Sequence, residues 1–497
     1  MKARLAVSLR AVNVRRGDKW VLRGIDWELQ PGERWALLGD NGAGKTQLLK
    51  LICADIWPTP SRTAANGRTY RVGARTVDLI EAKARIAYIG GEQQDKYARY
   101  GWNLTVREIV ASGLHQTDLL LSPITPPEAR RVSSALRSCA IKRLEGRRFL
   151  TLSYGEKRLA LLARALVREP DWLLLDEFYN GLDLDYRRRI DAILRRLQTR
   201  GQSWIATAHR AMDVPQGTHS LLELVGGRIR TMKRLLRADF ERLERRAGES
   251  AARKSREPPR RIPAADSRAA VLVNVSNADL YVDYRQVLKG LNWQLRRGEH
   301  WSVFGANGAG KSTFLKLLYG DLSPALGGRI ERRGCPAATP IMQWKRQVGF
   351  VSPELQSIYA VDVTILELVA RGRHSSIGLN DAPTPKDEKT ARYWLRFFKL
   401  LKAAGRRPRE LSYGQLRRAL IARAMAANAR ILLLDEPFTG LDPRQRAMMK
   451  RLLEILMKRR LTVIAAVHHA EDLPRGMTHG LYLHKGRAYP SNPYFAT

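Results

Sequence analysis

The apolar positions of this chain follow the same order twice. Residues 35–38 and 301–304 are mostly apolar, and each run ends at a glycine-rich octet. After each octet, apolar residues recur at helical spacing, in 48–52 and again in 314–318. A short apolar run bounded by glycines is consistent with a buried strand, and the later spacing favours an amphipathic helix. Each half is therefore predicted to contain a strand, a tight turn and a helix, in that order.

The two octets fit the pattern Gly-x-x-x-x-Gly-Lys-[Ser/Thr] of a phosphate-binding loop. Its glycines let backbone N–H groups turn inward around phosphates, and the N-terminus of the next helix adds a positive dipole end. The lysine is expected to reach the terminal phosphates of a nucleotide, and the last hydroxyl to ligate Mg²⁺. The nucleotide-binding residues expected here are Gly39, Asn41, Gly42, Gly44, Lys45, Thr46, Gly305, Asn307, Gly308, Gly310, Lys311 and Ser312.

A second apolar run in each half ends in two neighbouring acidic residues. Residues 172–175 and 431–434 are apolar without interruption, as is typical of a strand buried on both faces of a parallel sheet. At the end of such a strand, an aspartate can hold the water shell of Mg²⁺, and a glutamate can polarise the water that attacks a phosphate. The two pairs are Asp176-Glu177 and Asp435-Glu436.

A pentad in each half begins another predicted helix. Residues 152–156 read Leu-Ser-Tyr-Gly-Glu, and residues 411–415 read Leu-Ser-Tyr-Gly-Gln. The pentads resemble the Leu-Ser-Gly-Gly-Gln signature of ATP-binding-cassette (ABC) ATPases, with Tyr for the first Gly and, in the first half, Glu for Gln. The resemblance implies that the retained Ser and second Gly meet the γ-phosphate of ATP. These residues are Ser153, Gly155, Ser412 and Gly414.

The resemblance also implies an α/β fold for each half. An ABC ATPase domain combines a RecA-like core around a parallel sheet, an antiparallel β subdomain and an α-helical signature subdomain. In that family two cassettes stack head to tail, so each cassette lends its signature to the ATP bound by the other. The chain is therefore expected to form an intramolecular pseudo-dimer that hydrolyses ATP at two sites with Mg²⁺.

A histidine follows each acidic pair at equal spacing and resembles the family's switch histidine, which contacts the γ-phosphate. His468 is assigned this role rather than His469, because that choice aligns Pro215 with Pro474. The expected catalytic residues are Glu177, Glu436, His209 and His468. The expected metal-binding residues are Thr46, Asp176, Gln94, Ser312, Asp435 and Gln356.

Three features match the family less closely. The family's glutamine lies a residue or two nearer the strand than Gln94 and Gln356, so Gln93 is also a candidate. Phe178 follows the first glutamate where the family has Pro, so the loop there is expected to be set differently. In the family, an aromatic residue stacks on the adenine ring of ATP. The second half has two candidate residues for this role, whereas in the first half the candidates are a tryptophan and the flat face of an arginine guanidinium group. The aromatic candidates are Tyr281, Tyr284 and Trp20.

The length of 497 residues suits two cassettes of roughly 230 residues each. The expected organisation is a first cassette over 1–232, a basic, Pro-containing linker over 233–268, and a second cassette over 269–497. Because no apolar stretch is long enough to span a membrane and the N-terminus does not resemble a signal peptide, a cytoplasmic protein is expected, including one bound peripherally to the inner face of the membrane. The three cysteines lie far apart and indicate neither a disulfide framework nor a zinc site.

A net charge of +39 favours anionic partners. The tandem layout, the short linker and the Leu-Ser-Tyr-Gly pentads resemble the ModF-type ABC proteins associated with molybdate transport, which implies a membrane permease subunit as the partner. The alternative is the ABC-F type of soluble factor, which would act on the ribosome or on nucleic acid. That type resembles this chain less, because its linker is longer and its switch reads Ser-His-Asp-Arg.

Overall fold

The computed structural model describes residues 3–17, 19–40, 42–60, 67–182, 184–208, 213–234, 269–282, 284–336, 339–353, 363–374, 383–439, 441, 443–459, 461–467 and 470–491. The chain divides into two compact units, Met1–Arg256 and Glu257–Thr497. Apart from its first two residues, the predicted linker over 233–268 lies outside the described ranges. Those two residues end a strand, β10 (Arg228–Arg234), so regular structure continues slightly beyond the expected end of the first cassette.

The first unit contains a six-stranded sheet in the order β10-β9-β3-β8-β7-β6. Its five strands from β9 to β6 are parallel, and β10 is an antiparallel edge strand. The bounds of the other strands are β3 Arg34–Leu38, β6 Ile86–Ile89, β7 Trp172–Leu175, β8 Ser203–Ala208 and β9 Ser220–Val225. A second, antiparallel sheet has the order β2-β1-β4-β5, and its strands are β1 Leu5–Arg16, β2 Lys19–Leu29, β4 Gly67–Val72 and β5 Arg75–Thr76.

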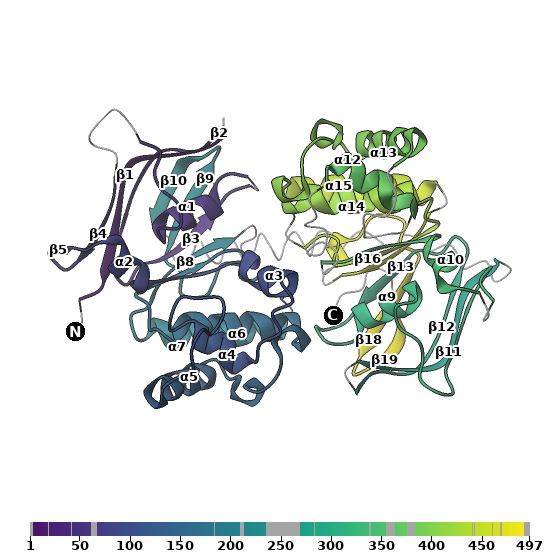
Figure 1. Cartoon of the computed structure of the whole chain (residues 1–497), viewed down its shortest axis with the longest axis horizontal. Coiled ribbons are helices and arrows are strands. Elements are labelled where there is room, and N and C mark those ends of the chain that lie inside the picture. Colours follow the sequence, from purple (N-terminus) through teal and green to yellow (C-terminus); the bar gives the residue numbers. More distant parts are fainter. Residues whose placement is uncertain are drawn as a thin grey trace. The chain divides into compact units, whose positions relative to one another are not determined.

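The apolar run of β7 explains how this unit is layered. Trp172 and Leu174 pack into a core with α1 (Lys45–Ile52) and the antiparallel sheet, whereas Leu173 and Leu175 face a separate core built by the helices. Figure 1 shows these helices gathered on one side of the unit. They are α3 Gly91–Arg99, α4 Val106–Ser112, α5 Pro126–Ser138, α6 Tyr154–Leu166 and α7 Leu184–Gln198, with short 3-10 helices at Lys142–Leu144 and Phe149–Thr151. The remaining helix, α2 (Leu79–Arg85), packs through Ala82 into the core with α1 and the antiparallel sheet.

The second unit repeats this plan. Its large sheet has the order β15-β16-β17-β13-β18-β19, with β19 antiparallel at the edge, and its small sheet has the order β12-β11-β14. The strands are β11 Val271–Val282, β12 Arg285–Arg296, β13 Trp301–Phe304, β14 Arg329–Arg332, β15 Val348–Val351, β16 Ile431–Asp435, β17 Thr462–Ala466, β18 His479–His484 and β19 Arg487–Ser491.

The helices of the second unit again cover both faces of its central strand. Ile431 and Leu433 of β16 pack with α9 (Lys311–Tyr319), and Leu432 and Leu434 face the helical core. The other helices are α10 Ile341–Lys345, α12 Ile365–Ala370, α13 Pro385–Phe397, α14 Tyr413–Ala426 and α15 Pro443–Lys458, with 3-10 helices at Arg371–His374, Leu401–Ala403, Pro408–Glu410 and Ala470–Asp472. The predicted α/β fold with two cassettes is confirmed. Among the described helices, none has the length and apolar character needed to cross a bilayer.

A half-buried histidine, His300, precedes β13 and is expected to make the stability of this unit depend on pH. Its ring nitrogen Nδ1 accepts a hydrogen bond from the backbone N–H of Val463 at 3.2 Å, which requires a neutral acceptor at that nitrogen. Burial, followed by the charge of His479, lowers the pKa of His300 from 6.5 to about 4. The folded state therefore resists protonation that the unfolded chain accepts.

We expect the stability of the second unit to fall as pH drops from 6.5 toward 4, because the unfolded state alone binds the proton of His300 in that window. The loss from this residue is about 3 kcal/mol at most. His300→Asn keeps an acceptor for Val463 but does not titrate. Unfolding in urea, compared between the two proteins above pH 6.5 and near pH 4, should show a smaller acid loss in the variant. Equal losses in both proteins would show that His300 is not the group responsible.

Candidate functional site

The phosphate-binding octets form tight turns between a strand and a helix in both units. Gly44 and Gly310 are the N-caps of α1 and α9, with φ values of 105° and 100°. A Cβ atom on Gly44 would lie 2.9 Å from the carbonyl oxygen of Val21, and one on Gly310 would lie 2.6 Å from Leu288 Cδ2. Glycine is therefore required at both caps, by backbone conformation and by space.

The lysine of each octet folds over its own loop and is buried. Lys45 Nζ donates to the carbonyl oxygens of Gly39 at 2.7 Å and Asp40 at 3.2 Å. Lys311 Nζ donates to the carbonyls of Gly305 at 2.6 Å and Ala306 at 3.0 Å. A phosphate oxygen, being charged, is a stronger partner for an ammonium group than these neutral carbonyls. This chemistry supports the expectation that the two loops bind the phosphates of a nucleotide.

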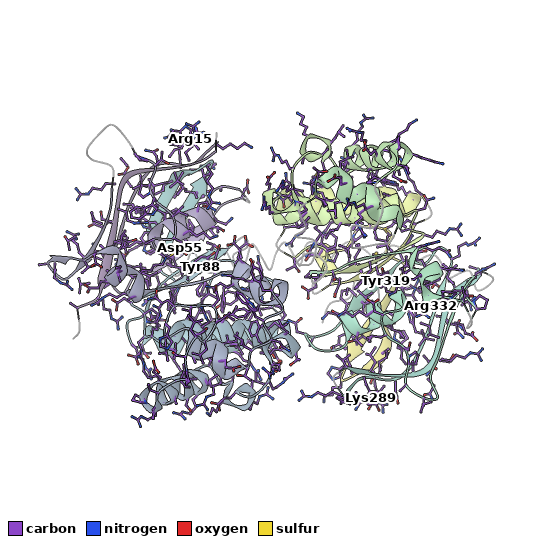
Figure 2. All side chains as sticks on the ribbon, in the orientation of Figure 1. Arg15, Asp55, Tyr88, Lys289, Tyr319 and Arg332 are labelled. Atoms are coloured by element: carbon purple, nitrogen blue, oxygen red, sulfur yellow. The ribbon has the colours of Figure 1, made fainter. Side chains whose placement is uncertain are left out.

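Asp176 follows β7 and is surrounded by three hydroxyl groups from different elements. Thr46 of α1 and Tyr88 of β6 donate to its Oδ2 at 2.7 and 2.9 Å, and Thr207 of β8 donates to its Oδ1 at 2.8 Å. Tyr88 is labelled in Figure 2. Burial, followed by the charge of Glu177, raises the pKa of Asp176, and the three hydrogen bonds oppose that rise. Thr46 and Asp176 were predicted from the sequence, whereas Tyr88 and Thr207 were not.

The two predicted catalytic glutamates share an uncommon backbone conformation. Glu177 and Glu436 both have φ of 48°, in the left-handed region that non-glycine residues rarely adopt and that often marks functional positions. Asn180 Nδ2 donates to Glu177 Oε2 at 3.0 Å, and Thr439 Oγ1 donates to Glu436 Oε2 at 3.2 Å. Each carboxylate is thus held by a residue three positions further along the chain.

The backbone at the two glutamates is the same, with φ of 48° at Glu177, which Phe178 follows, and at Glu436, which Pro437 follows. The expectation that Phe178 sets the following loop differently stays a prediction. Phe178 is buried, and the guanidinium of Arg158 lies 5.8 Å from the centre of its ring. The aromatic ring is therefore accommodated by packing in the helical core.

The signature pentads begin α6 and α14 with capping boxes. Ser153 Oγ accepts from the N–H of Glu156 at 3.3 Å, and Glu156 Oε2 accepts from the N–H of Ser153 at 2.9 Å. Ser412 and Gln415 make the same reciprocal pair in α14, at 3.3 and 2.9 Å. Glu and Gln are both suitable at this position of a capping box. The replacement of Gln by Glu in the first pentad therefore preserves the local structure.

Two buried arginines on the signature helices make different contacts. Arg417 of α14 donates to the backbone carbonyls of Glu436 and Thr439, the latter at 3.4 Å. Arg158 of α6 donates to the Tyr154 hydroxyl at 2.8 Å. In the second unit, the signature helix is thus hydrogen-bonded directly to the backbone of the predicted catalytic glutamate.

Several predicted site residues lie outside the described residues, namely Asn41, His209, His468 and Gln356. Gln94 lies in α3 and is buried, and its Oε1 has no hydrogen-bond partner among the described residues. Its amide oxygen, the Thr46 hydroxyl and the Asp176 carboxylate are oxygen ligands of the kind that Mg²⁺ prefers. The described residues contain no group of three or more His, Cys, Asp or Glu side chains that could hold a metal by themselves. A cation here would therefore depend on phosphate oxygens as well as protein oxygens.

The candidate adenine-stacking residues lie at the surface. Tyr281 and Tyr284 of the second unit are exposed, and Tyr284 is fully so. Trp20 of the first unit is 44% exposed, and the guanidinium of Arg15, labelled in Figure 2, lies 5.7 Å from its ring centre. The first unit therefore places both of its candidate groups, a tryptophan and an arginine, side by side.

A family model described as ABC transporter matches residues 22–180 and 288–439, once in each unit. The ABC transporter ATP-binding protein ModF of Escherichia coli strain K12 is 30% identical over 471 residues, which cover 91% of both chains. The putative HMP/thiamine import ATP-binding protein YkoD of Bacillus subtilis strain 168 is 25% identical over 98% of this chain and 91% of its own length.

Among solved structures, the model of ribosome-bound archaeal Pelota and ABCE1 matches 97% of this chain and 78% of the compared chain, with a TM-score of 0.62. Its sequence identity of 19% makes this a likeness of fold. The paired family matches, the relatives that match most of the chain and the loop geometry agree with one another. The chain belongs to the ABC transporter family and is an ATP-binding ATPase with a family domain in each of its two units.

Proposed function

We propose that this protein is the ATP-hydrolysing component of a transport system and acts on a membrane permease at the cytoplasmic face of the membrane. The observation that carries the proposal is the 30% identity to ModF across 91% of both chains. YkoD, a putative import ATP-binding protein by its name, supports the same class. The finer assignment, molybdate transport, rests only on the resemblance to ModF-type proteins.

In this proposal, each ATP is held between the loop of one cassette and the signature of the other. The first site combines Lys45, Thr46, Asp176, Glu177 and His209 with Ser412 and Gly414. The second site combines Lys311, Ser312, Asp435, Glu436 and His468 with Ser153 and Gly155. The shared phosphates hold the cassettes together, and hydrolysis removes that bridge, so a bound permease can sense the separation.

The chemistry at each site is in-line attack of water on the γ-phosphate. Glu177 and Glu436 accept hydrogen bonds from the attacking water and polarise it, and the lysines neutralise phosphate charge. Mg²⁺, when bound, supplies further charge stabilisation on the phosphate oxygens. Thr46, Asp176 and Gln94 would hold it in the first site, and Ser312, Asp435 and Gln356 would hold it in the second.

The second candidate is a factor that acts on the ribosome or on nucleic acid. The net charge of +39 favours it, because such a charge attracts phosphate backbones over long distances at low salt. A charged cytoplasmic leaflet attracts the same basic residues, so charge alone does not separate the two candidates.

Affinity capture with the Glu177→Gln/Glu436→Gln protein tests the proposal. The variant is incubated in lysate with ATP and Mg²⁺, and the retained material is analysed by mass spectrometry and RNA quantitation. A matched control, Lys45→Met/Lys311→Met, should retain no partner that depends on bound ATP. We expect an integral membrane permease to be retained by the glutamine variant alone. Retention of ribosomes or nucleic acid in its place would overturn the proposal in favour of the second candidate.

A further inference from the structure

One hydroxyl group in the first unit links both acidic residues of the site. Thr207 Oγ1 donates to Asp176 Oδ1 at 2.8 Å and accepts from the backbone N–H of Glu177 at 2.7 Å. A donor and an acceptor role on the same oxygen fix its hydrogen atom toward Asp176. The Thr207 side chain therefore sets the position of the Asp176 carboxylate relative to the backbone of Glu177.

Tyr88 holds the other oxygen of the same carboxylate. Its hydroxyl donates to Asp176 Oδ2 at 2.9 Å, next to the bond from Thr46. An ionised carboxylate offers only acceptors, so the Tyr88 hydroxyl is the donor in this bond. Both carboxylate oxygens are thus occupied by hydroxyl donors from three elements, and the charge is stabilised in a single orientation.

The second unit has no hydroxyl at either corresponding position. Strand register identifies the counterparts. Tyr88 pairs with Leu174 of β7, and at the matching place in the second unit Phe350 pairs with Leu433 of β16. Phe350 is therefore the counterpart of Tyr88. On the other side of β7, Leu175 pairs with Ala206, and on the other side of β16, Leu434 pairs with Ala465. The residues that follow these two alanines are Thr207 and Ala466, so Ala466 is the counterpart of Thr207. The N–H of Glu436 donates to the backbone carbonyl of Ala466 at 3.0 Å, in place of a side-chain hydroxyl.

We infer that Thr207, supported by Tyr88, is a positioning residue that presets the metal-holding carboxylate of the first site and lowers the Mg²⁺ concentration which that site needs. This inference rests on the proposed function for the identity of the site. An aspartate already fixed by Thr207 and Tyr88 loses little freedom when it accepts hydrogen bonds from metal-bound water. The first site should therefore bind Mg²⁺–ATP at lower Mg²⁺ concentration than it does without these two hydroxyl groups.

The test isolates the first site in the full chain with Lys311→Met and measures binding of a fluorescent ATP analogue as Mg²⁺ is varied. In that parent, Thr207→Ala should raise the Mg²⁺ concentration at half-saturation about tenfold, as expected for the loss of one hydrogen bond to a charged group. Thr207→Ser restores the hydroxyl and should restore the parent value. Tyr88→Phe, a substitution matched by Phe350 in the second unit, should shift half-saturation in the same direction.

The reciprocal change is made in the isolated second site, with Lys45→Met as parent. Ala466→Thr should lower the Mg²⁺ concentration at half-saturation. The inference is overturned if Thr207→Ala and Tyr88→Phe both bind with the parent's Mg²⁺ dependence, or if Thr207→Ser fails to rescue. If the Lys311→Met parent itself shows no Mg²⁺-dependent binding, the assignment of the first site fails, which is a separate result.

Discussion

Glu177→Gln/Glu436→Gln is expected to reduce ATP turnover by about 100-fold or more, because the loss of a positioned group that polarises water or accepts its proton has effects of this size. Glutamine keeps a side-chain oxygen for the donors now bound by the two glutamates, Asn180 and Thr439. Local structure should therefore survive while the negative charge beside the attacking water is lost. Steady-state release of phosphate with Mg²⁺–ATP is the measurement.

A matched control is Glu28→Gln, which removes a carboxylate that pairs with Arg71 on the exposed face of the antiparallel sheet. It should hydrolyse ATP at the wild-type rate.

The single variants Glu177→Gln and Glu436→Gln then compare the two sites. Because Phe178 follows Glu177 where Pro437 follows Glu436, Glu177→Gln is expected to reduce turnover less than Glu436→Gln, and equal losses would show that the two sites are equivalent or strictly coupled. Turnover that survives in the double variant would contradict both assignments.

Lys45→Met and Lys311→Met are expected to weaken ATP binding at their own sites by about 10- to 100-fold, the range for a hydrogen bond to a charged group. Methionine has a similar length and no charge. It leaves the carbonyls that each lysine now contacts without their ammonium partner, so thermal unfolding must be compared alongside binding. Lys83→Met serves as the control, since Lys83 lies at the surface in an ion pair with Asp55.

Equilibrium binding of ATP should show wild-type affinity in the control. In the double variant Lys45→Met/Lys311→Met, high-affinity binding should be absent. Unchanged affinity in a variant that unfolds at the wild-type temperature would show that the buried lysines do not contact the phosphates.

Much of each cassette could be predicted from patterns of residue types over a few neighbouring positions in the sequence. The run 172–175 is apolar at every position because alternate residues enter two different cores, and this identified a buried strand. The octets required glycine at fixed offsets, so their turns could be placed before any contact was known. Ser153 and Ser412 stand three residues before Glu156 and Gln415, a spacing that predicts helix starts.

Features that depend on register between distant strands could not be predicted. Thr207 and Tyr88 are ordinary strand residues in the sequence, and only the neighbouring positions of β6, β7 and β8 bring their hydroxyls to Asp176.

The end of β10 was missed for another reason. Lys233 and Arg234 read as part of a charged linker, yet they pair with Leu221 and Ser220 as an edge strand, whose outer side tolerates charge.

In the proposed pair, each cassette lends its signature to the ATP bound by the other. The most direct test introduces Ser412→Asp into the Glu177→Gln/Glu436→Gln protein and determines which of the two sites still holds ATP. Aspartate keeps an acceptor for the N-cap of α14 but adds negative charge toward the γ-phosphate, and Ser412→Asn keeps the cap without that charge. ATP retained on gel filtration should be lost only from the site of Lys45. Addition of Lys45→Met should then leave the remaining ATP in place, and addition of Lys311→Met should remove it. The reverse pattern, or ATP retained at both sites, would contradict the head-to-tail pair.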